Sequence, residues 1–283
     1  MNIINAIINL VSNPVTQVVE YYKGRNRAND AGAALEEYIK DLFAGTFDTE
    51  PNERRKKQEE IFSYLGNNSN PPDAMLKGGD AIEVKKIESD NAPLNLNSSY
   101  PKHELYRSDP MISKKCRDAE DGKWDKKDIL YVGGVVYKNT DKLKHLCMVY
   151  GTEYCASAEC YNRIKESIKT GVESTEGIEF KKSKELGHIN KVDHLGITYM
   201  RIRGMWGIEN PWRVFQDIYQ RDTSKEFNFM CIISNKKWET LDNRNELLEL
   251  SKENDALKVI DMQVKDPDEP SKMIDVKLIT FHI

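Results

Sequence analysis

The chain has 283 residues, of which 39% are hydrophobic and 31% charged, a composition that is typical of a globular protein and excludes a fibrous or disordered one. No apolar run approaches the roughly 18 residues needed to cross a bilayer, so we expect no membrane partner. The formal net charge of −4 excludes a uniformly basic surface for nucleic acid, although a local basic section remains compatible with it.

The N-terminal region, roughly residues 1–65, is expected to be helical. Residues 2–22 alternate apolar and polar groups at helical spacing, and Asn13-Pro14 interrupts the pattern where Pro14 suits the start of a second helix. The apolar stretch from Ile3 to Val11 lacks the basic segment and the cleavage site of a secretory signal. We therefore interpret it as a helix that packs on the fold or on a partner.

Two further helices are expected in this region. Asn29-Asp30 offers an N-cap to Ala31–Phe43, whose apolar residues form one face. Glu53–Leu65 is rich in charge and predicts a surface helix, after which Asn67–Pro72 has the composition of a turn.

The remaining chain mixes strand and helix patterns. Helical spacing occurs at Glu159–Lys169 and Trp212–Tyr219, and Asn91–Pro101 is expected to be a loop. Because no linker marks a boundary, we predict a single α/β domain over residues 1–283, with an elaborated C-terminal half. The predicted strands are Asp73–Lys77, Ala81–Ile87, Ile129–Tyr137, Leu146–Tyr150, Ile197–Ile202, Phe229–Ser234, Ala256–Val264 and Met273–Phe281.

The cysteines do not predict a metal site, but they bear on the cellular compartment of the protein. They are odd in number and lack CxxC spacing, so they do not predict a zinc site. Reduced, mostly buried thiols suit an intracellular protein, and we expect a cytoplasmic location. The five are Cys116, Cys147, Cys155, Cys160 and Cys231.

The most informative segment runs from Pro72-Asp73 to Glu83-Val84-Lys85. A glycine-rich loop at 78–80 predicts a β-hairpin, and alternate strand residues point to the same side. A three-residue loop would bring Asp73, Glu83 and Lys85 together on one face. A two-residue loop would place Asp73 on the other face unless a bulge restored it.

This combination of side chains suits phosphodiester hydrolysis. Two carboxylates can hold Mg²⁺ and a neighbouring lysine can stabilise phosphoryl charge, which together address the demands of that reaction. A solvated hairpin edge rich in charge would show the same pattern, so the motif alone leaves both interpretations open.

The chain resembles a known group of nucleases. The stretch Asn29-Asp30-Ala31-Gly32 through Leu35-Glu36-Glu37, followed by Pro72-Asp73 and Glu83-Val84-Lys85, resembles the PD-(D/E)xK nuclease superfamily. The first thirty residues and Asn97-Ser98-Ser99-Tyr100-Pro101-Lys102 are similar to the NgoPII-type type II restriction endonucleases, over most of the chain.

The resemblance implies a fold, an activity and partners. It implies a central mixed sheet flanked by helices, and a bacterial homodimer that needs Mg²⁺ and cuts double-stranded DNA at the palindrome GGCC. A cognate DNA methyltransferase would belong to the same system without stable contact. Two alternatives stay open: another nuclease with the same core, for repair or junction resolution, and a DNA-binding module without enzymatic activity.

The resemblance also implies roles for the hairpin residues. Asp73 and Glu83 would hold Mg²⁺, and Lys85 would orient or activate the attacking water or stabilise phosphoryl charge. Asp80 lies close enough to compete with Asp73 for the metal. Asp73 is preferred because it follows Pro72, as the superfamily pattern expects.

A helix glutamate often supplies another metal contact in such nucleases. Glu36 is the candidate for this catalytic role and Glu37 is the alternative. An exposed helix carboxylate without a catalytic role would give the same pattern.

A section rich in Lys and Arg lies well after the hairpin in the sequence. Residues 181–238 contain 11 Lys and Arg against 6 Asp and Glu, whereas residues 239–283 contain 6 against 11. Arg201 and Arg203 alternate on a predicted strand and suit the guanine acceptors of the major groove, although solvated arginines on a strand edge fit equally. Lys114 and Lys115 suit phosphate contacts. The candidate DNA contacts are Arg201, Arg203, Asn210, Arg213, Lys114 and Lys115.

Overall fold

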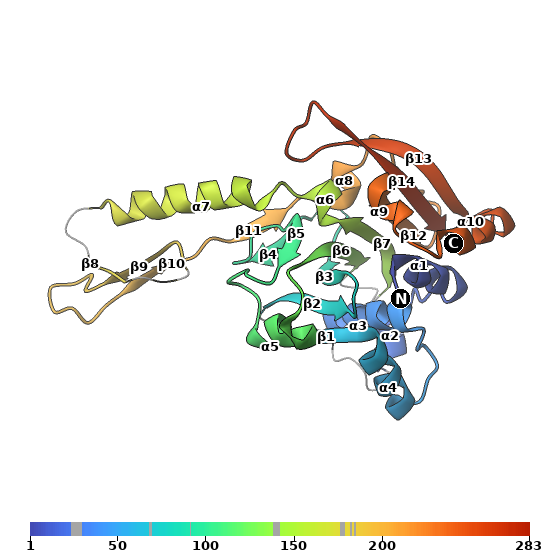
Figure 1. Cartoon of the computed structure of the whole chain (residues 1–283), viewed down its shortest axis with the longest axis horizontal. Helices are drawn as coiled ribbons and strands as arrows, with labels where there is room; N and C mark the ends of the chain where they lie inside the picture. The colour runs from blue at the N-terminus through green and yellow to red at the C-terminus, as the bar shows by residue number, and fades with distance from the viewer. Residues whose placement is uncertain are drawn as a thin grey trace.

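A large mixed sheet runs through the centre of the molecule (Figure 1). The computed structural model describes residues 1–23, 30–67, 70–90, 92–137, 142–175, 179–181, 183 and 185–283. Within these ranges the central sheet has nine strands, in the order β1-β2-β3-β6-β7-β12-β14-β13, with β5 paired to β6. They are β1 (Phe62–Asn67), β2 (Asn70–Leu76), β3 (Ala81–Ile87), β5 (Glu104–Tyr106), β6 (Lys126–Val136), β7 (Leu143–Tyr150), β12 (Asn228–Ser234), β13 (Leu257–Lys265) and β14 (Met273–His282).

The strands pair in both directions, which confirms the mixed sheet. β3 is parallel to β6 and β7 is parallel to β12, whereas β2 with β3 and β6 with β7 are antiparallel. Successive residues point to opposite faces of the sheet. On β6, for example, Leu130 joins a first hydrophobic core, which includes Leu35 and Tyr38, whereas Tyr131 joins a second core, which includes Tyr154 and Trp212.

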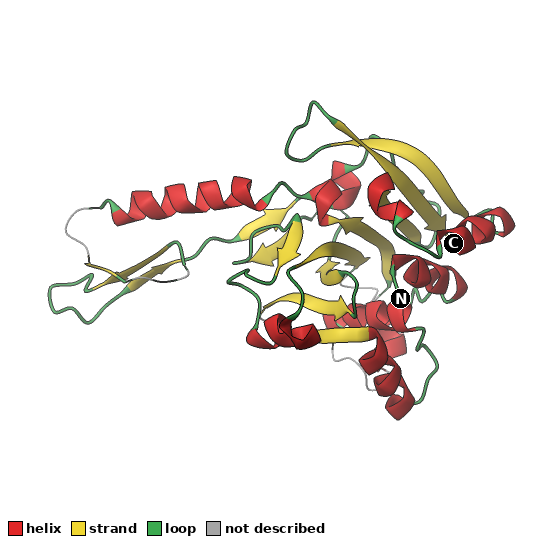
Figure 2. Cartoon of the chain, viewed as in Figure 1, coloured by secondary structure: helices red, strands yellow, loops and turns green. Residues whose placement is uncertain are grey.

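Helices cover both faces of the sheet, so the fold has three layers (Figure 2). The first core packs beneath α1, α2, α3 and α10, and the second beneath α5, α6 and α8. Each helix in the described ranges is too short or too polar to span a membrane. The helices are α1 (Ile3–Ser12), α2 (Val18–Lys23), α3 (Ala31–Ala44), α4 (Pro51–Ile61), α5 (Lys114–Asp118), the 3₁₀ turn η1 (Ala119–Gly122), α6 (Gly151–Tyr154), α7 (Ala158–Glu173), α8 (Pro211–Val214), α9 (Asn235–Glu239) and α10 (Arg244–Glu253).

The helix α3 lies directly on the sheet and is the predicted helix extended by one residue. The Asp30 side chain accepts from the amides of Gly32 and Ala33 at 2.7 and 3.0 Å, which confirms its N-cap role; Asn29 lies outside the described residues. A Cβ on Gly134 of β6 would lie 2.6 Å from Cδ2 of Leu35. Glycine at that position therefore permits the close approach of α3.

Several predicted boundaries are wrong. The charged helix α4 ends at Ile61, because Phe62 and Tyr64 are buried and the chain enters β1 instead. The expected turn before the hairpin becomes the start of β2 at Asn70. Pro14 does not begin the second helix, since α2 starts at Val18.

Two further predictions need correction. The loop expected at residues 91–101 contains β4 (Leu94–Asn97), which pairs with β11 (Trp206–Ile208). The helix expected at Trp212–Tyr219 is only the single turn of α8.

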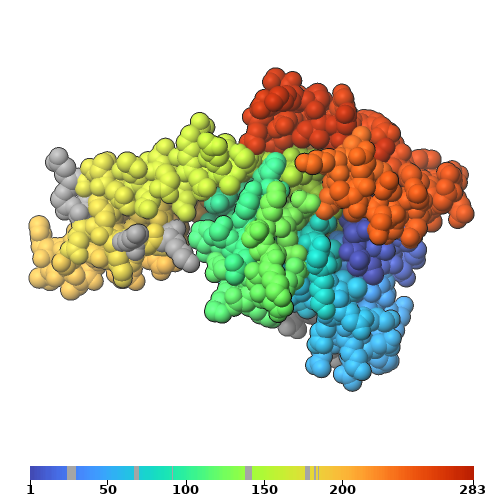
Figure 3. All heavy atoms as spheres, viewed as in Figure 1, coloured from blue at the N-terminus to red at the C-terminus, as the bar shows by residue number. Residues whose placement is uncertain are grey.

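A long projection leaves the body of the molecule, and we call residues 158–204 the arm (Figure 3). It consists of α7 and a small sheet of β8 (Glu179–Phe180), β9 (Gly187–Asn190) and β10 (Met200–Ile202). Strand β10 is shorter than predicted. The Asp193 side chain accepts from the amides of Leu195 and Thr198 at 2.9 and 2.7 Å, which holds the preceding residues in a turn.

An ion-pair network fixes α3 against α4. Arg54 bonds through Nη2 to Glu37 at 2.6 Å and through Nε to Asp41 at 2.7 Å. The Asp41 side chain is fully buried, so the loss of Arg54 removes a cation that binds a carboxylate away from water.

We expect Arg54→Met to lower the free energy of unfolding by about 3 kcal/mol, because it removes the guanidinium group that bridges Glu37 and the buried Asp41. The matched control is Arg55→Met, because Arg55 is 77% exposed and lies 3.5 Å from Glu59. This control should cost less than about 0.5 kcal/mol. Urea unfolding followed by circular dichroism measures both, and equal effects would contradict the role given to Arg54.

Candidate active site

The hairpin of β2 and β3 forms with a register slightly different from the one predicted. Met75 pairs with Ala81, and the amide of Leu76 donates to the carbonyl oxygen of Asp80 at 2.9 Å. A three-residue loop of residues 77–79 therefore joins the strands, one residue earlier than expected.

Despite this shift, Asp73, Glu83 and Lys85 remain on the same face of the sheet. Extending the observed register places Asp73 opposite Glu83 rather than opposite Lys85. All three residues still occupy the face of the sheet that carries the second core, because they are odd-numbered like Met75 and Ala81. The hairpin thus brings together the three side chains that sequence analysis singled out.

These side chains make direct contacts. The Nζ atom of Lys85 lies 2.5 Å from Oε1 of Glu83, and the Val84 amide donates to Oδ2 of Asp73 at 2.7 Å. The other carboxylate oxygen of Glu83, Oε2, is buried and lacks a hydrogen-bond partner among the described residues. A buried acceptor in this state is costly unless a ligand or water meets it.

Burial and mutual repulsion disfavour the presence of two ionised carboxylates in the cluster. Burial, reinforced by the Glu83 carboxylate, raises the pKa of Asp73 to about 8. Burial opposes the charge on Lys85, yet Glu83 and Asp73 hold the pKa of this lysine above its ordinary value. A divalent cation at the carboxylates would remove the repulsion between them.

The cluster opens into a cavity of about 160 Å³. Its walls include the segment that follows β4, where the Ser99 Oγ is buried without a partner among the described residues. Sequence analysis expected a loop here and gave it no chemical role. The lining residues are Asn70, Pro71, Asp73, Glu83, Lys85, Leu96, Asn97, Ser98, Ser99 and Met111.

The donor set fits a magnesium ion that keeps part of its water shell. Mg²⁺ prefers oxygen ligands and is commonly bound by one or two carboxylates, with water in the other positions. Asp73 and Glu83 supply two carboxylates, and Oε2 of Glu83 is a buried oxygen without a hydrogen-bond partner among the described residues, so it can bind a cation. Among the described residues no group of three or more His, Cys, Asp and Glu side chains forms a complete metal cluster.

The two helix glutamates have different surroundings. Glu36 lies within electrostatic reach of Lys85 and Glu83, and burial raises its pKa. Glu37 is ion-paired with Lys40 at 2.7 Å and with Arg54 at 2.6 Å, so the fold already uses its carboxylate. This arrangement favours Glu36 over Glu37 for an accessory role, from a position at the edge of the cluster.

Asp80, the rival of Asp73, points away from the cluster. Its carboxylate accepts from the Tyr150 hydroxyl at 2.7 Å and from Nζ of Lys237 at 2.6 Å. Asp80 and Lys237 line a different cavity from the one that holds Asp73, and Asp80 itself is buried. The geometry therefore supports Asp73 as the metal ligand.

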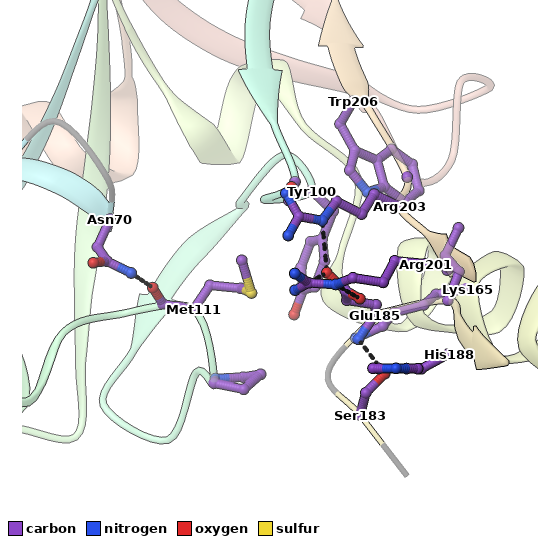
Figure 4. A pocket seen from close by; sticks show the side chains of 14 residues that line it. Asn70, Tyr100, Met111, Lys165, Ser183, Glu185, His188, Arg201, Arg203 and Trp206 are labelled. Carbon is purple, nitrogen blue, oxygen red and sulfur yellow. Dashed lines mark hydrogen bonds and ion pairs between the residues drawn. The ribbon is translucent and has the colours of Figure 1, made fainter. Parts of the chain in front are cut away.

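Arg201 and Arg203 lie on the arm beside a second cavity of about 420 Å³ (Figure 4). Both arginines bond to Glu185, a residue that sequence analysis did not single out. Asn70 and Met111 line this cavity as well as the one that holds Asp73, Glu83 and Lys85, so the two cavities adjoin. Only the tertiary structure reveals this proximity, because the arm is distant from the hairpin in sequence.

Asn210 does not fit its expected role in DNA contact. It is fully buried, its amide donates to the carbonyl oxygens of Asp90 and Ala92, and its Oδ1 caps the Trp212 amide. The side chain is therefore used inside the fold. Arg213, by contrast, is 59% exposed and lies 3.3 Å from Glu209.

The upstream basic pair lies on the short helix α5. Lys114 is 87% exposed and pairs with Asp118, and the Nζ atom of Lys115 lies 5.9 Å from the centre of the Tyr64 ring. Met111, three residues before Lys114, lines both cavities. This position is compatible with phosphate contacts near the cluster.

Comparisons with known proteins identify the family of the chain. The model of a family described as NgoPII restriction endonuclease matches residues 1–265. A relative named type II restriction enzyme NgoPII, from Neisseria gonorrhoeae, is 54% identical over 283 residues, which covers 100% of both chains. No solved structure matches the chain. The resemblance stated from the sequence is thereby confirmed: the chain belongs to the NgoPII restriction endonuclease family and is an enzyme of the type II restriction class.

Proposed function

We propose that this protein hydrolyses phosphodiester bonds in double-stranded DNA at the palindrome GGCC, with Mg²⁺ as cofactor and with Asp73, Glu83 and Lys85 as catalytic residues. The observation that supports it best is the buried cluster of these three side chains on one face of the β2–β3 hairpin. Membership of the NgoPII restriction endonuclease family supports the site-specific cleavage of DNA.

Each residue of the cluster has its own role in the proposed reaction. Asp73 and Glu83 would hold Mg²⁺, which would supply Lewis-acid stabilisation of the phosphoryl oxygens and a more acidic water. Lys85 keeps its positive charge beside Glu83 and stabilises the negative charge that develops on the phosphate. Burial strengthens this interaction because few waters screen it. Glu36 contributes from the edge of the cluster.

A palindromic site implies two copies of the protein. The two strands of GGCC are related by a twofold axis, and a homodimer presents one catalytic cluster to each strand. The cognate methyltransferase acts on the same sequence without stable contact with this chain. We place the protein in the bacterial cytoplasm, where its five free thiols stay reduced.

The direct test is digestion of a plasmid of known sequence by the purified chain. With Mg²⁺ we expect a discrete set of fragments whose ends all map to GGCC, and with EDTA we expect intact plasmid. Fragments that map to another short sequence would refute the GGCC assignment alone. Ends without a common sequence, or cleavage of branched DNA only, would instead support a repair or junction-resolving nuclease.

A further inference from the structure

Arg201, Arg203 and Glu185 form one compact unit on the arm. Oε2 of Glu185 accepts from Nε of Arg201 at 2.7 Å, and Oε1 accepts from Nη2 of Arg201 at 2.7 Å and from Nε of Arg203 at 2.6 Å. The Glu185 side chain is 16% exposed, whereas the arginine side chains are 46% and 54% exposed. The carboxylate therefore lies beneath two guanidinium groups that face outward.

These hydrogen bonds use one edge of each guanidinium group. They engage Nε and Nη2 of Arg201 and Nε of Arg203, which leaves the Nη1 group of Arg201 and both Nη groups of Arg203 outside this contact. An arginine held in this way is already oriented, so it loses less conformational freedom when its outer edge binds a planar acceptor pair. Guanine offers such a pair, N7 and O6, in the major groove.

The unit faces the space in front of the catalytic cluster. It lines the cavity of about 420 Å³ shown in Figure 4, and Asn70, Ser98 and Met111 line both this cavity and the catalytic one. DNA whose scissile phosphate reaches Lys85 would therefore pass the outer edges of the two arginines.

We propose that Glu185 is a specificity-positioning residue: it holds Arg201 and Arg203 side by side so that they recognise two neighbouring guanines of one half-site. The proposal rests on the proposed function, because it assumes a duplex in front of Asp73, Glu83 and Lys85. Arg201 lies on β10 and Arg203 follows the end of that strand two residues later, and the single carboxylate of Glu185 joins them.

Because Glu185 is negatively charged, its positioning role predicts opposite effects on binding to the recognition site and to random DNA. A carboxylate near DNA repels phosphates, so it should weaken binding to DNA of any sequence. Its contribution to recognition should appear only where the arginines meet guanine. Glu185→Gln should therefore leave unchanged or strengthen binding to a random duplex, and weaken binding to the recognition site.

The experiment uses the full chain and begins with selection of the preferred site from a library of random duplexes. Dissociation constants are then measured for that site, for the same site with each guanine replaced by 7-deazaguanine, which lacks the N7 acceptor, and for a random duplex. The variants are Glu185→Gln, Glu185→Asp and the matched control Glu179→Gln. Glu179 is also on the arm, but its carboxylate lies 2.6 Å from Lys191 and is 52% exposed.

We expect Glu185→Gln to reduce the preference for the selected site over the random duplex by at least about tenfold, in line with the loss of good arginine–guanine contacts. The penalty for 7-deazaguanine at two adjacent positions should largely disappear in this variant. Glu185→Asp should restore part of the preference, and Glu179→Gln should behave as the wild type.

Three results would overturn the inference. Equal weakening on both duplexes would give Glu185 only a structural role, and an equal change in Glu179→Gln would indicate a general charge effect of the arm. A selected site without adjacent guanines would refute the proposed reading while leaving the nuclease function intact. If the wild type cut no DNA yet selected a site in this way, the proposed function would fail and the positioning role would stand.

Discussion

Lys85→Ala should lower the rate of DNA cleavage by about a thousandfold or more while the protein keeps its fold. Lys85 is the cation of the cluster, 2.5 Å from Glu83, and its side chain is only 23% exposed. Removal of a charge stabiliser from a water-poor site typically costs several kcal/mol of transition-state stabilisation. Single-turnover cleavage of a duplex that contains the site measures the rate, and circular dichroism monitors the fold.

The neighbouring lysine provides the matched control. Lys86 follows Lys85 on β3, but it points to the opposite side and pairs with Glu88 at 2.8 Å. Lys86→Ala should retain cleavage within about threefold of the wild type. If both variants lost activity equally, charge on the strand rather than the position of Lys85 would explain the effect.

The assignment of the metal ligands has a comparable test. Asp73→Ala should abolish cleavage and leave the fold intact, whereas Asp80→Ala should chiefly lower stability because it leaves Lys237 without one of its two carboxylates. Loss of cleavage in a stably folded Asp80→Ala, with activity retained in Asp73→Ala, would show that the assignment is wrong.

That Asp73, Glu83 and Lys85 share one face of the hairpin could be predicted from the sequence, because strand periodicity is a local property. Residues two apart share a face whatever the strand pairs with, so Glu83 and Lys85 are placed together by spacing alone. The sequence pattern predicts the loop at residues 78–80 and the structure has it at 77–79, because either of the two adjacent glycines suits a turn. Gly78 takes the left-handed conformation, with φ of 62°. Asp73, Glu83 and Lys85 stay on the same face of the sheet because the pairing of the two strands shifts by two positions, an even number.

Other parts of the site depend on contacts that no local pattern encodes. Glu36 and Glu37 are adjacent on one helix, and the contact from another element that distinguishes them is the ion pair of Arg54 in α4 with Glu37. Asn210 resembled a base-reading residue because its polar side chain lies among aromatic and basic neighbours. Its burial follows from the carbonyl groups of Asp90 and Ala92, which are more than a hundred positions earlier in the chain.

The last prediction concerns metal and charge in DNA binding. Burial and repulsion from Glu83 raise the pKa of Asp73 to about 8. Above that pH, Asp73 adds a second negative charge to that of Glu83, against the single positive charge of Lys85. A scissile phosphate adds a further negative charge at this site. Without a divalent cation the cluster should therefore repel its own substrate.

Ca²⁺ can neutralise the carboxylates without supporting efficient cleavage, because it accepts oxygen ligands in looser geometry than Mg²⁺. We expect Ca²⁺ to strengthen binding of the wild type to a GGCC duplex by about tenfold or more relative to EDTA, at constant pH and ionic strength. In Glu83→Ala one repelling charge and one ligand are absent, so binding in EDTA should already be tighter and Ca²⁺ should change it by less than about threefold.

Glu88→Ala is the appropriate control, because Glu88 follows β3 and lies outside the residues that line the catalytic cavity. This variant also removes one negative charge, yet it should respond to Ca²⁺ as the wild type does. Fluorescence anisotropy with a labelled duplex gives the dissociation constants for the three proteins in both conditions. Identical affinities for the wild type and Glu83→Ala, with and without Ca²⁺, would remove the carboxylate pair from the DNA-binding site and leave the hairpin a structural element.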